Sequence, residues 1–246
     1  MPWPPRPIAV LGFTKPVLGK SNNMSRLRAM PRRRSYDQYC AAARALDRVG
    51  DRWSLLIVRE LLAGPRRYTD LHADLPGVST DVLASRLRDL ERDDLVTRRK
   101  LPPPAAAVVY ELTGRGAGLL PVLGALAEWG AADLGEPRPT DAVRAHWFAL
   151  PLLRVLGERA GGEAGTVEVV LDTGTFHLGL GPEHRAPEPA AYGDGPAGGE
   201  PDARLTLSTA ACRALVDGGL ALADAVREGR VAVHGDSPLA KVLRGR

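Results

Sequence analysis

The chain has 246 residues, of which 44% are hydrophobic and 25% charged, a composition typical of folded soluble proteins and too apolar for wholesale disorder. It contains no run of about 18 apolar residues, and its opening MPWPPRPIAVLGFTKP has prolines where a secretory signal needs an unbroken apolar segment. We therefore expect neither a membrane span nor ordinary secretion. Two cysteines are too few for a disulfide framework or a four-thiolate zinc site, which favours a reducing bacterial cytoplasm.

The net charge of +4 is unevenly distributed along the chain. Residues 1–34 hold eight basic and no acidic side chains, whereas residues 35–134 and 135–246 have net charges of −1 and −3. The basic total therefore does not by itself indicate nucleic-acid binding, which has to come from local patches. We expect residues 1–34 to be a disordered tail: either an extension upstream of a start at Met24 or Met30, or an arm that attracts phosphate irrespective of sequence.

Composition divides the remaining chain into two expected domains. Residues 35–134 are rich in helical patterns, and residues 135–140 form a linker in which two prolines prevent continuation of the preceding helix. Residues 141–246 mix strand and helix patterns. Within them, the Gly/Pro/Ala-rich run Gly181–Pro201 is expected to be a long loop.

The first domain contains three helical patterns in close succession. Apolar residues at helical spacing from Leu55 to Leu62 predict a helix, and Tyr68–Leu75 predicts a shorter one. Ser79 then stands at the N-cap of a third helix. The apolar stripe of this helix is Leu83, Leu87 and Leu90, so the opposite face and its flanks carry Thr80, Asp81, Ala84, Ser85, Arg86, Arg88 and Arg92.

Two strand patterns, Val96–Lys100 and Val108–Leu112, follow the third helix, and Thr113 then caps a predicted helix through Trp129. This order is that of a winged helix-turn-helix, in which a helix enters the DNA major groove and a hairpin wing contacts flanking phosphate. The carboxylate of Asp81 has two open roles: accepting a hydrogen bond from cytosine N4, or bonding back to its own helix N-terminus. The candidate DNA-binding residues are Ser79, Thr80, Asp81, Ala84, Ser85, Arg86, Arg88, Arg92, Arg98, Arg99 and Lys100.

A set of short strings in this region resembles the HxlR branch of the MarR-like transcriptional regulators. The strings are Tyr39-Cys40, ALDRVGDRWSLLIVRELLAGPRRYTDL, LPGVSTDVLASRLRDLE, Leu95-Val96, YELT and LLPVLGALAEWG, and they span about Ser35 to Gly130. The resemblance implies a homodimer joined by the first and last helices of the module, which reads a pseudo-palindromic operator in double-stranded DNA. One departure is Ala107, where the family usually has a wing arginine.

The second domain alternates strand and helix patterns, which predicts an α+β fold with the helices on one side of a sheet. The fold class expected for the whole chain is thus α+β, with an N-terminal winged helix-turn-helix and a C-terminal α+β domain. The predicted elements are a helix at Asp141–Arg159, a hairpin of Thr166–Leu171 and Thr175–Leu180, a strand at Arg204–Leu207, helices from Ser208 to Val216 and at Leu220–Glu228, a strand at Arg230–His234 and a helix at Pro238–Leu243.

The end of the chain, PDARLTLSTAACRALVDGGLALADAVREGRVAVHGDSPLAKVL, resembles the C-terminal half of a sterol-carrier-protein-like domain. The resemblance implies an apolar tunnel for an acyl chain or another hydrophobic small molecule. The predicted function is therefore a regulator that responds to an apolar effector, and the alternative is a hydrophobic-ligand carrier whose helical module mainly dimerises. The candidate ligand-binding residues are Phe176, Leu178, Leu215, Leu220, Val226 and Val233; they could equally fill the core.

Sites for other chemistry are few. Cys40 stands just before the first helix, where backbone amides lower a thiol pKa, so a thiol-based redox-sensing regulator is a further alternative to a packing role. The run Gly114–Gly118 imitates a dinucleotide fingerprint but lacks its second strand and acid. The histidines show no metal-ligand spacing, and no serine lies in a nucleophile elbow. We therefore expect no metal, no cofactor and no catalytic residue, hence not an enzyme.

Overall fold

The computed structural model describes residues 35–181 and 191–245. The tail expected at residues 1–34 lies outside the described residues, and so does much of the loop expected at Gly181–Pro201. Residues 35–246 form one compact unit. Within the described ranges, none of the helices combines the length and apolar character that crossing a bilayer requires.

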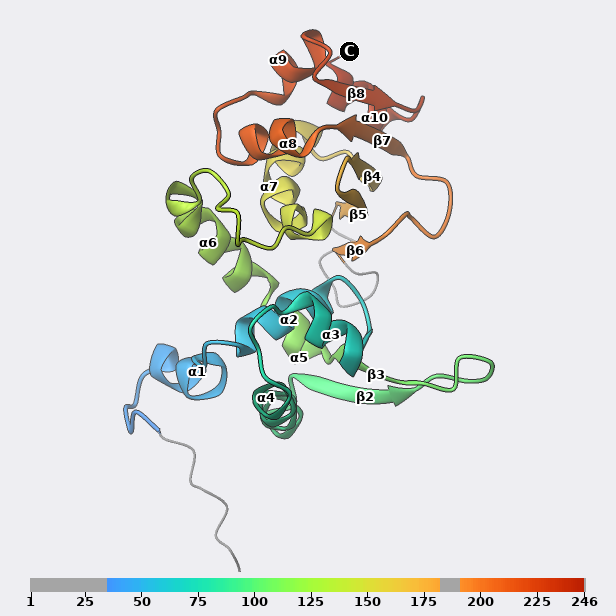
Figure 1. Cartoon of the computed structure of the whole chain (residues 1–246). Coiled ribbons are helices and arrows are strands. Elements are labelled where there is room, and N and C mark those ends of the chain that lie inside the picture. Colours follow the sequence, from blue (N-terminus) through green and yellow to red (C-terminus); the bar gives the residue numbers. More distant parts are fainter. Residues whose placement is uncertain (1–34, 182–190, 246) are drawn as a thin grey trace, which may run out of the picture. The chain divides into compact units, whose positions relative to one another are not determined.

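A winged helix-turn-helix occupies the first half of the described chain (Figure 1). Helices α3 (Tyr68–Asp74) and α4 (Thr80–Arg92) form the helix-turn-helix, and strands β2 (Val96–Lys100) and β3 (Val108–Leu112) pair antiparallel as the wing. A two-residue strand, β1 (Arg66–Arg67), pairs with the other edge of β3, so the strand order is β1-β3-β2. This strand was not predicted, because two arginines carry no strand pattern.

Two helices, α1 (Ala41–Val49) and α2 (Ser54–Leu62), precede the helix-turn-helix. Their apolar sides meet those of α3 and α4 in a core to which α2 and α4 contribute side chains spaced three or four residues apart. The predicted stripe of α4 is confirmed, since its leucines lie in this core. The most deeply buried members are Ile57, Leu71, Leu75, Leu83, Leu87 and Leu90.

The predicted helix from Thr113 to Trp129 is divided in two. Thr113 caps α5 (Gly114–Ala117), where its hydroxyl accepts a hydrogen bond from the Gly116 N–H at 3.1 Å, and α6 (Leu120–Gly130) starts after a break. Pro121 explains the division. Proline has no N–H and its ring clashes with the carbonyl four residues earlier, so it is excluded from the interior of a continuous helix but fits the first turn of a new one.

The second half contains a five-stranded sheet in the order β6-β5-β4-β7-β8, in which β4 and β7 are parallel and the other neighbours antiparallel. Burial alternates along β7 and β8, so at these two strands one face of the sheet is covered and the other is exposed. The elements are η1 (Ala131–Asp133), η2 (Ala145–Phe148), α7 (Ala149–Ala160), β4 (Gly165–Leu171), β5 (Gly174–Leu180), β6 (Tyr192–Asp194), β7 (Ala203–Leu207), α8 (Thr209–Val216), α9 (Leu222–Arg227), β8 (Val231–His234) and α10 (Pro238–Arg244).

Most predicted elements of the second half are confirmed to within two residues, but two predictions are wrong. The helix expected to start at Asp141 starts at Ala149, after the 3-10 turn η2, and Pro151 therefore lies in its first turn, where the N–H groups have no partner within the helix. The run Gly181–Pro201 is not a loop throughout, because β6 pairs with β5 at the edge of the sheet. The long-range pairing that creates this strand has no local sequence signal.

A second hydrophobic core fills the sheet-helix half and extends into the first half. It contains Phe176, Leu178 and Leu205, which are fully buried, together with Val58 and Leu62 from α2. The two halves thus share apolar contacts at α2. The domain limits 35–134, 135–140 and 141–246 stay predictions.

Candidate nucleic-acid interface

The start of α4 is fixed by two hydrogen bonds. The hydroxyl of Ser79 accepts the Val82 N–H at 3.3 Å, which confirms the predicted N-cap. The hydroxyl of Tyr68, at the start of α3, donates to the carbonyl oxygen of Thr80 at 2.7 Å. The two bonds hold the first turn of α4 in place, and this turn is the part of a recognition helix that reaches base edges.

The outward face of α4 carries the residues predicted for DNA binding. Since Leu83, Leu87 and Leu90 lie in the core, the opposite face is left to solvent. Ser79, Thr80, Asp81, Arg88 and Arg92 are exposed, and Ala84, Ser85 and Arg86 are half-buried.

The arginines of α4 differ in their partners. Arg86 contacts Asp51 at 3.3 Å and Asp89 at 3.1 Å, and Arg92 contacts the same Asp89 at 2.6 Å. Among the described residues, the Nε of Arg88 donates only to a carbonyl of its own helix, that of Ala84, at 3.2 Å. Arg88 therefore keeps an uncompensated charge on this face, whereas Arg86 and Arg92 share a carboxylate.

Carboxylates also pair with two of the three wing cations. Arg98 donates to Glu91 of α4 at 2.6 Å, and Arg99 donates to Glu111 of β3 at 2.7 Å. The hydrogen bond and charge of Glu91 raise the pKa of Arg98. The first pair ties the wing to α4, beside which β2 runs in Figure 1. Exposed pairs of this kind contribute little stability and can be exchanged for phosphate contacts.

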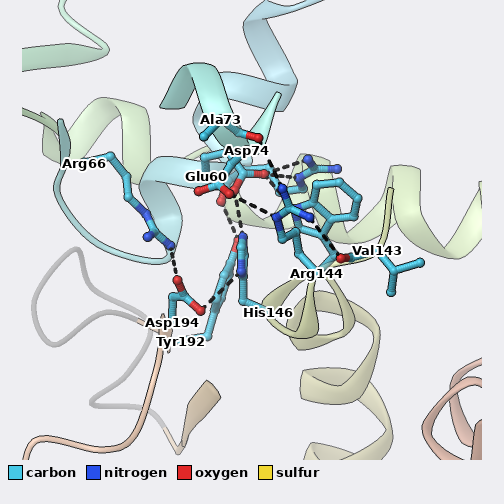
Figure 2. A network of polar contacts seen from close by, with 11 residues as sticks. Glu60, Arg66, Ala73, Asp74, Val143, Arg144, His146, Tyr192 and Asp194 are labelled. Carbon is cyan, nitrogen blue, oxygen red and sulfur yellow. Dashed lines mark hydrogen bonds and ion pairs between the residues drawn. The ribbon is translucent and has the colours of Figure 1, made fainter. Parts of the chain in front are cut away.

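A buried polar cluster links α2 to the second half, and sequence reasoning missed it (Figure 2). Glu60 is fully buried; its carboxylate lies 2.7 Å from Nε2 of His146 and accepts the indole N–H of Trp147 at 2.9 Å. Nδ1 of His146 lies 3.4 Å from Oδ1 of Asp194, and Oδ2 of the same carboxylate accepts a hydrogen bond from Arg66 at 3.0 Å. The available signal was a single glutamate inside the apolar helix sequence SLLIVRELL.

The hydrogen bonds to Glu60 decide its charge state. Burial by itself raises the pKa of this carboxyl, but the hydrogen bond from His146 and the charge of Arg59 outweigh burial and leave the pKa lowered. Arg59 also contacts the Glu60 carboxylate at 2.6 Å and stacks over the Trp147 ring. Glu60 is therefore a paired carboxylate.

Comparison with known proteins relates the first half to one family. The model of the HxlR-like helix-turn-helix family matches residues 48–137. YvaP of Bacillus subtilis, an uncharacterized HTH-type transcriptional regulator, is 38% identical over 86 residues, which are 35% of this chain and 80% of YvaP. YodB of Bacillus subtilis, an HTH-type transcriptional regulator, is 35% identical over 96 residues, 39% of this chain and 85% of YodB.

The chain belongs to the HxlR-like helix-turn-helix family. DNA-binding regulation is the function that this membership supports. The solved structure of the reduced form of YodB matches at 30% identity over 41% of this chain and all of that chain, with a TM-score of 0.36. The family model ends at residue 137, so it does not cover the sheet-helix half.

The two cysteines of this HxlR-like protein lie in opposite surroundings. Cys40 is exposed at the N-cap of α1, where the N–H groups of Ala43 and Ala42 lower its thiol pKa although the sulfur makes no capping hydrogen bond. Cys212 is buried in α8, and burial raises the pKa of its thiol to about 12. Of the two thiols, that of Cys40 therefore has the surroundings that favour the thiolate.

The candidate ligand-binding residues lie in the second core. Phe176, Leu178 and Leu215 are almost completely inaccessible, Val233 is 9% exposed, and Leu220 and Val226 pack against them. This packing is also what a core without ligand requires, so their role in ligand binding stays a prediction. In the described ranges no group of three or more His, Cys, Asp or Glu side chains could hold a metal ion.

Proposed function

We propose that this HxlR-like protein is a homodimeric transcriptional regulator that reads a pseudo-palindromic operator with α4 and has no catalytic activity. The observation that carries the proposal is the geometry of α4: a capped helix with its leucine stripe in the core and Ser85, Arg88 and their neighbours facing outward. A helix of this kind fits the major groove, and its outward side chains then face the base edges.

The proposed roles of the α4 residues follow from their partners. Arg88 exchanges a carbonyl of its own helix for acceptors on a guanine edge, and Ser85, one turn earlier, contacts a base or a phosphate. Arg86 is held by Asp51 and Asp89, so it supports the face rather than reading bases. Asp81, exposed in the first turn of α4, either accepts from cytosine N4 or stabilises the helix N-terminus.

Equilibrium binding to a selected operator tests this proposal, with a scrambled duplex of the same length as competitor. Arg88→Ala should cost about 1–3 kcal/mol of operator binding, as expected for one lost base contact. The matched control is Arg154→Ala, which removes an exposed α7 arginine whose polar contact in the described part of the chain is with Glu158 of the same helix. Arg88→Ala binding the operator like the wild type would remove α4 as the reading element.

The proposed dimer rests on exposed apolar side chains of α6 and the α1 region. Leu126 is 45% exposed and Trp129 79% on α6, and Tyr39 before α1 is fully exposed. Leu126→Asp should place a charge in the proposed interface and shift sedimentation from dimer to monomer. Leu123 is buried, so an aspartate there would test folding instead. A wild-type monomer that binds the operator fully would contradict the dimer.

We further propose that the second half is a sterol-carrier-like domain. In this proposal, an acyl or other apolar small molecule binds to it and modulates DNA binding. What supports this is the apolar cluster of Phe176, Leu178, Leu215, Leu220, Val226 and Val233 between sheet and helices. A ligand changes DNA affinity only through unequal affinity for two states. Native mass spectrometry of protein from its own host, then DNA titration with the released ligand, tests it. If no ligand is found, the second half has a structural role. If a ligand is found but the protein does not bind DNA, the result favours the hydrophobic-ligand carrier.

Thiol sensing is a second candidate, favoured by the exposed, low-pKa Cys40. Treatment with hydrogen peroxide should change operator affinity in the wild type and in Cys212→Ser, whose thiol is buried, but not in Cys40→Ser. An equal response in Cys40→Ser would exclude the sensor.

A further inference from the structure

In residues 35–181 and 191–245, the polar contacts between the two halves converge on one short segment of the DNA-binding half (Figure 2). On that side, the partners lie between Arg59 and Asp74, in α2, β1 and α3, immediately before the turn that leads to α4. On the other side, they lie in η2, in β6 and in the residue before η2. Three further contacts join the halves besides the Glu60 cluster. The Tyr192 hydroxyl donates to the Arg59 carbonyl at 2.8 Å, and the Asp194 N–H donates to the Ala63 carbonyl at 3.3 Å. The third is the contact of Arg144 with α3.

Arg144 binds the C-terminal end of α3. Its Nε donates to the carboxylate of Asp74 at 3.2 Å, and its Nη2 donates to the carbonyl oxygen of Ala73 at 3.2 Å. The last carbonyls of a helix have no partner within the helix and carry partial negative charge, so a guanidinium satisfies them and is attracted to that end. One side chain of the second half therefore caps the first helix of the helix-turn-helix.

The end of α3 is mechanically close to the start of α4. Asp74 is the last residue of α3, the Val78 N–H donates to the Leu75 carbonyl at 3.2 Å, and Ser79 caps α4. Leu75 is buried in the same core as the α4 leucines, so the turn is short and packed. A displacement of the α3 end is therefore transmitted to the first turn of α4.

We propose that Arg144 is a positioning residue for operator recognition: by capping α3, it lets the second half set the orientation of α4. The inference rests on the proposed DNA-binding function and assigns a route between the two halves. Glu60 and His146 lie on the same route but are buried, and removing either leaves an unpaired buried group. Arg144 is 39% exposed on its side chain, so it can be replaced while the fold persists.

The experiment compares Arg144→Gln, Arg144→Lys, Asp74→Asn and the control Arg154→Gln in the full chain. Affinities are measured at one salt concentration for a selected operator and for a scrambled duplex. Arg144→Gln should weaken operator binding at least about fivefold, the lower end of typical coupling between sites, and leave scrambled binding within twofold. Asp74→Asn should lose less, because the Ala73 carbonyl contact remains, and Arg144→Lys should restore part of the affinity. Arg154→Gln should match the wild type.

Amide hydrogen exchange gives a readout that does not involve DNA. Exchange in the turn, at the Val78 N–H in particular, should accelerate in Arg144→Gln and not in Arg154→Gln. Unchanged operator affinity in Arg144→Gln, or an equal loss for both duplexes, overturns the positioning role. If the wild type does not discriminate operator from scrambled duplex, the proposed function is overturned instead. The exchange experiment still tests Arg144 in that case, because unchanged exchange at the turn overturns its role.

Discussion

The candidate DNA-binding residues and the candidate ligand-binding residues have opposite surroundings. Those of α4 and the wing are mostly exposed, and their arginines other than Arg88 make ion pairs at the surface, whereas the six apolar candidates of the second half lie in a core. Surface pairs add little to folding, so the first set is free to be selected for a partner. The second set is required for folding in any case. A functional role is therefore easier to recognise for the exposed residues of α4 than for the residues of the second core, which folding alone would bury.

Between these two regions lies the Glu60 cluster, whose charges the fold does require. Its groups come from both halves and are largely removed from water. A charge in that position is stable only while all its partners are in place. Substitutions in the Glu60 cluster should therefore change the free energy of unfolding, whereas substitutions in the exposed set should change DNA affinity.

The largest effect is expected for Glu60→Ala. The substitution leaves the indole N–H of Trp147 and the imidazole of His146 without their acceptor, and should lower the free energy of unfolding by about 3–5 kcal/mol in urea. The matched control is Glu158→Ala, an exposed glutamate paired with Arg154, for which we expect a change within about 0.5 kcal/mol. Equal costs for the two variants would mean that the cluster is not a structural link.

The contribution of the Glu60 carboxylate should also appear in the pH dependence of the free energy of unfolding. Because the folded-state pKa of Glu60 is lowered, its contribution is fully present above the ordinary glutamate pKa of about 4.3 and is lost as the pH falls from there through the folded-state value. In urea titrations over that window, the wild type should lose more stability than Glu60→Gln, which has no proton to take up. Parallel curves for the two proteins would assign the acid sensitivity to other groups.

Local features of the fold were predictable from the sequence, and non-local ones were not. The capped α4, its leucine stripe and the β4–β5 hairpin depend on spacing within about 15 residues, which the sequence displays directly. The strands β1 and β6 exist only through pairing with distant strands. The pairing of Glu60 with His146 spans 86 positions, and so no local pattern specified it. The salt bridge of Arg98 with Glu91 was equally invisible, since it depends on where the wing lies against α4, and that of Arg99 with Glu111 depends on the register of the two wing strands.

Two of the N-cap serines offer a matched comparison of intermediate size. Ser79 caps α4 and Ser208 caps α8, each by accepting a backbone N–H three residues ahead. Replacing either by alanine should cost about 1 kcal/mol of stability. Only Ser79→Ala should also weaken operator binding, because only α4 faces DNA in the proposed function. Thermal unfolding and operator titration of both variants measure the two effects, and an equal loss of DNA binding would point to general destabilisation.

The smallest effect is expected in the wing. There, the comparison is between two cations, Lys100 and Arg98, of which Arg98 is paired with a carboxylate. Lys100 is exposed and, in the described ranges, has no carboxylate partner, whereas Arg98 donates to Glu91. Lys100→Ala should weaken operator and scrambled duplex alike and reduce the slope of log affinity against log salt by about one, because one phosphate contact is lost. Glu91→Gln should act in the opposite direction, since it releases Arg98 for phosphate and removes a repelling charge. Salt titrations of both variants decide the matter: a loss confined to the operator would make Lys100 a base-reading residue, and an unchanged slope in both variants would place the wing away from DNA.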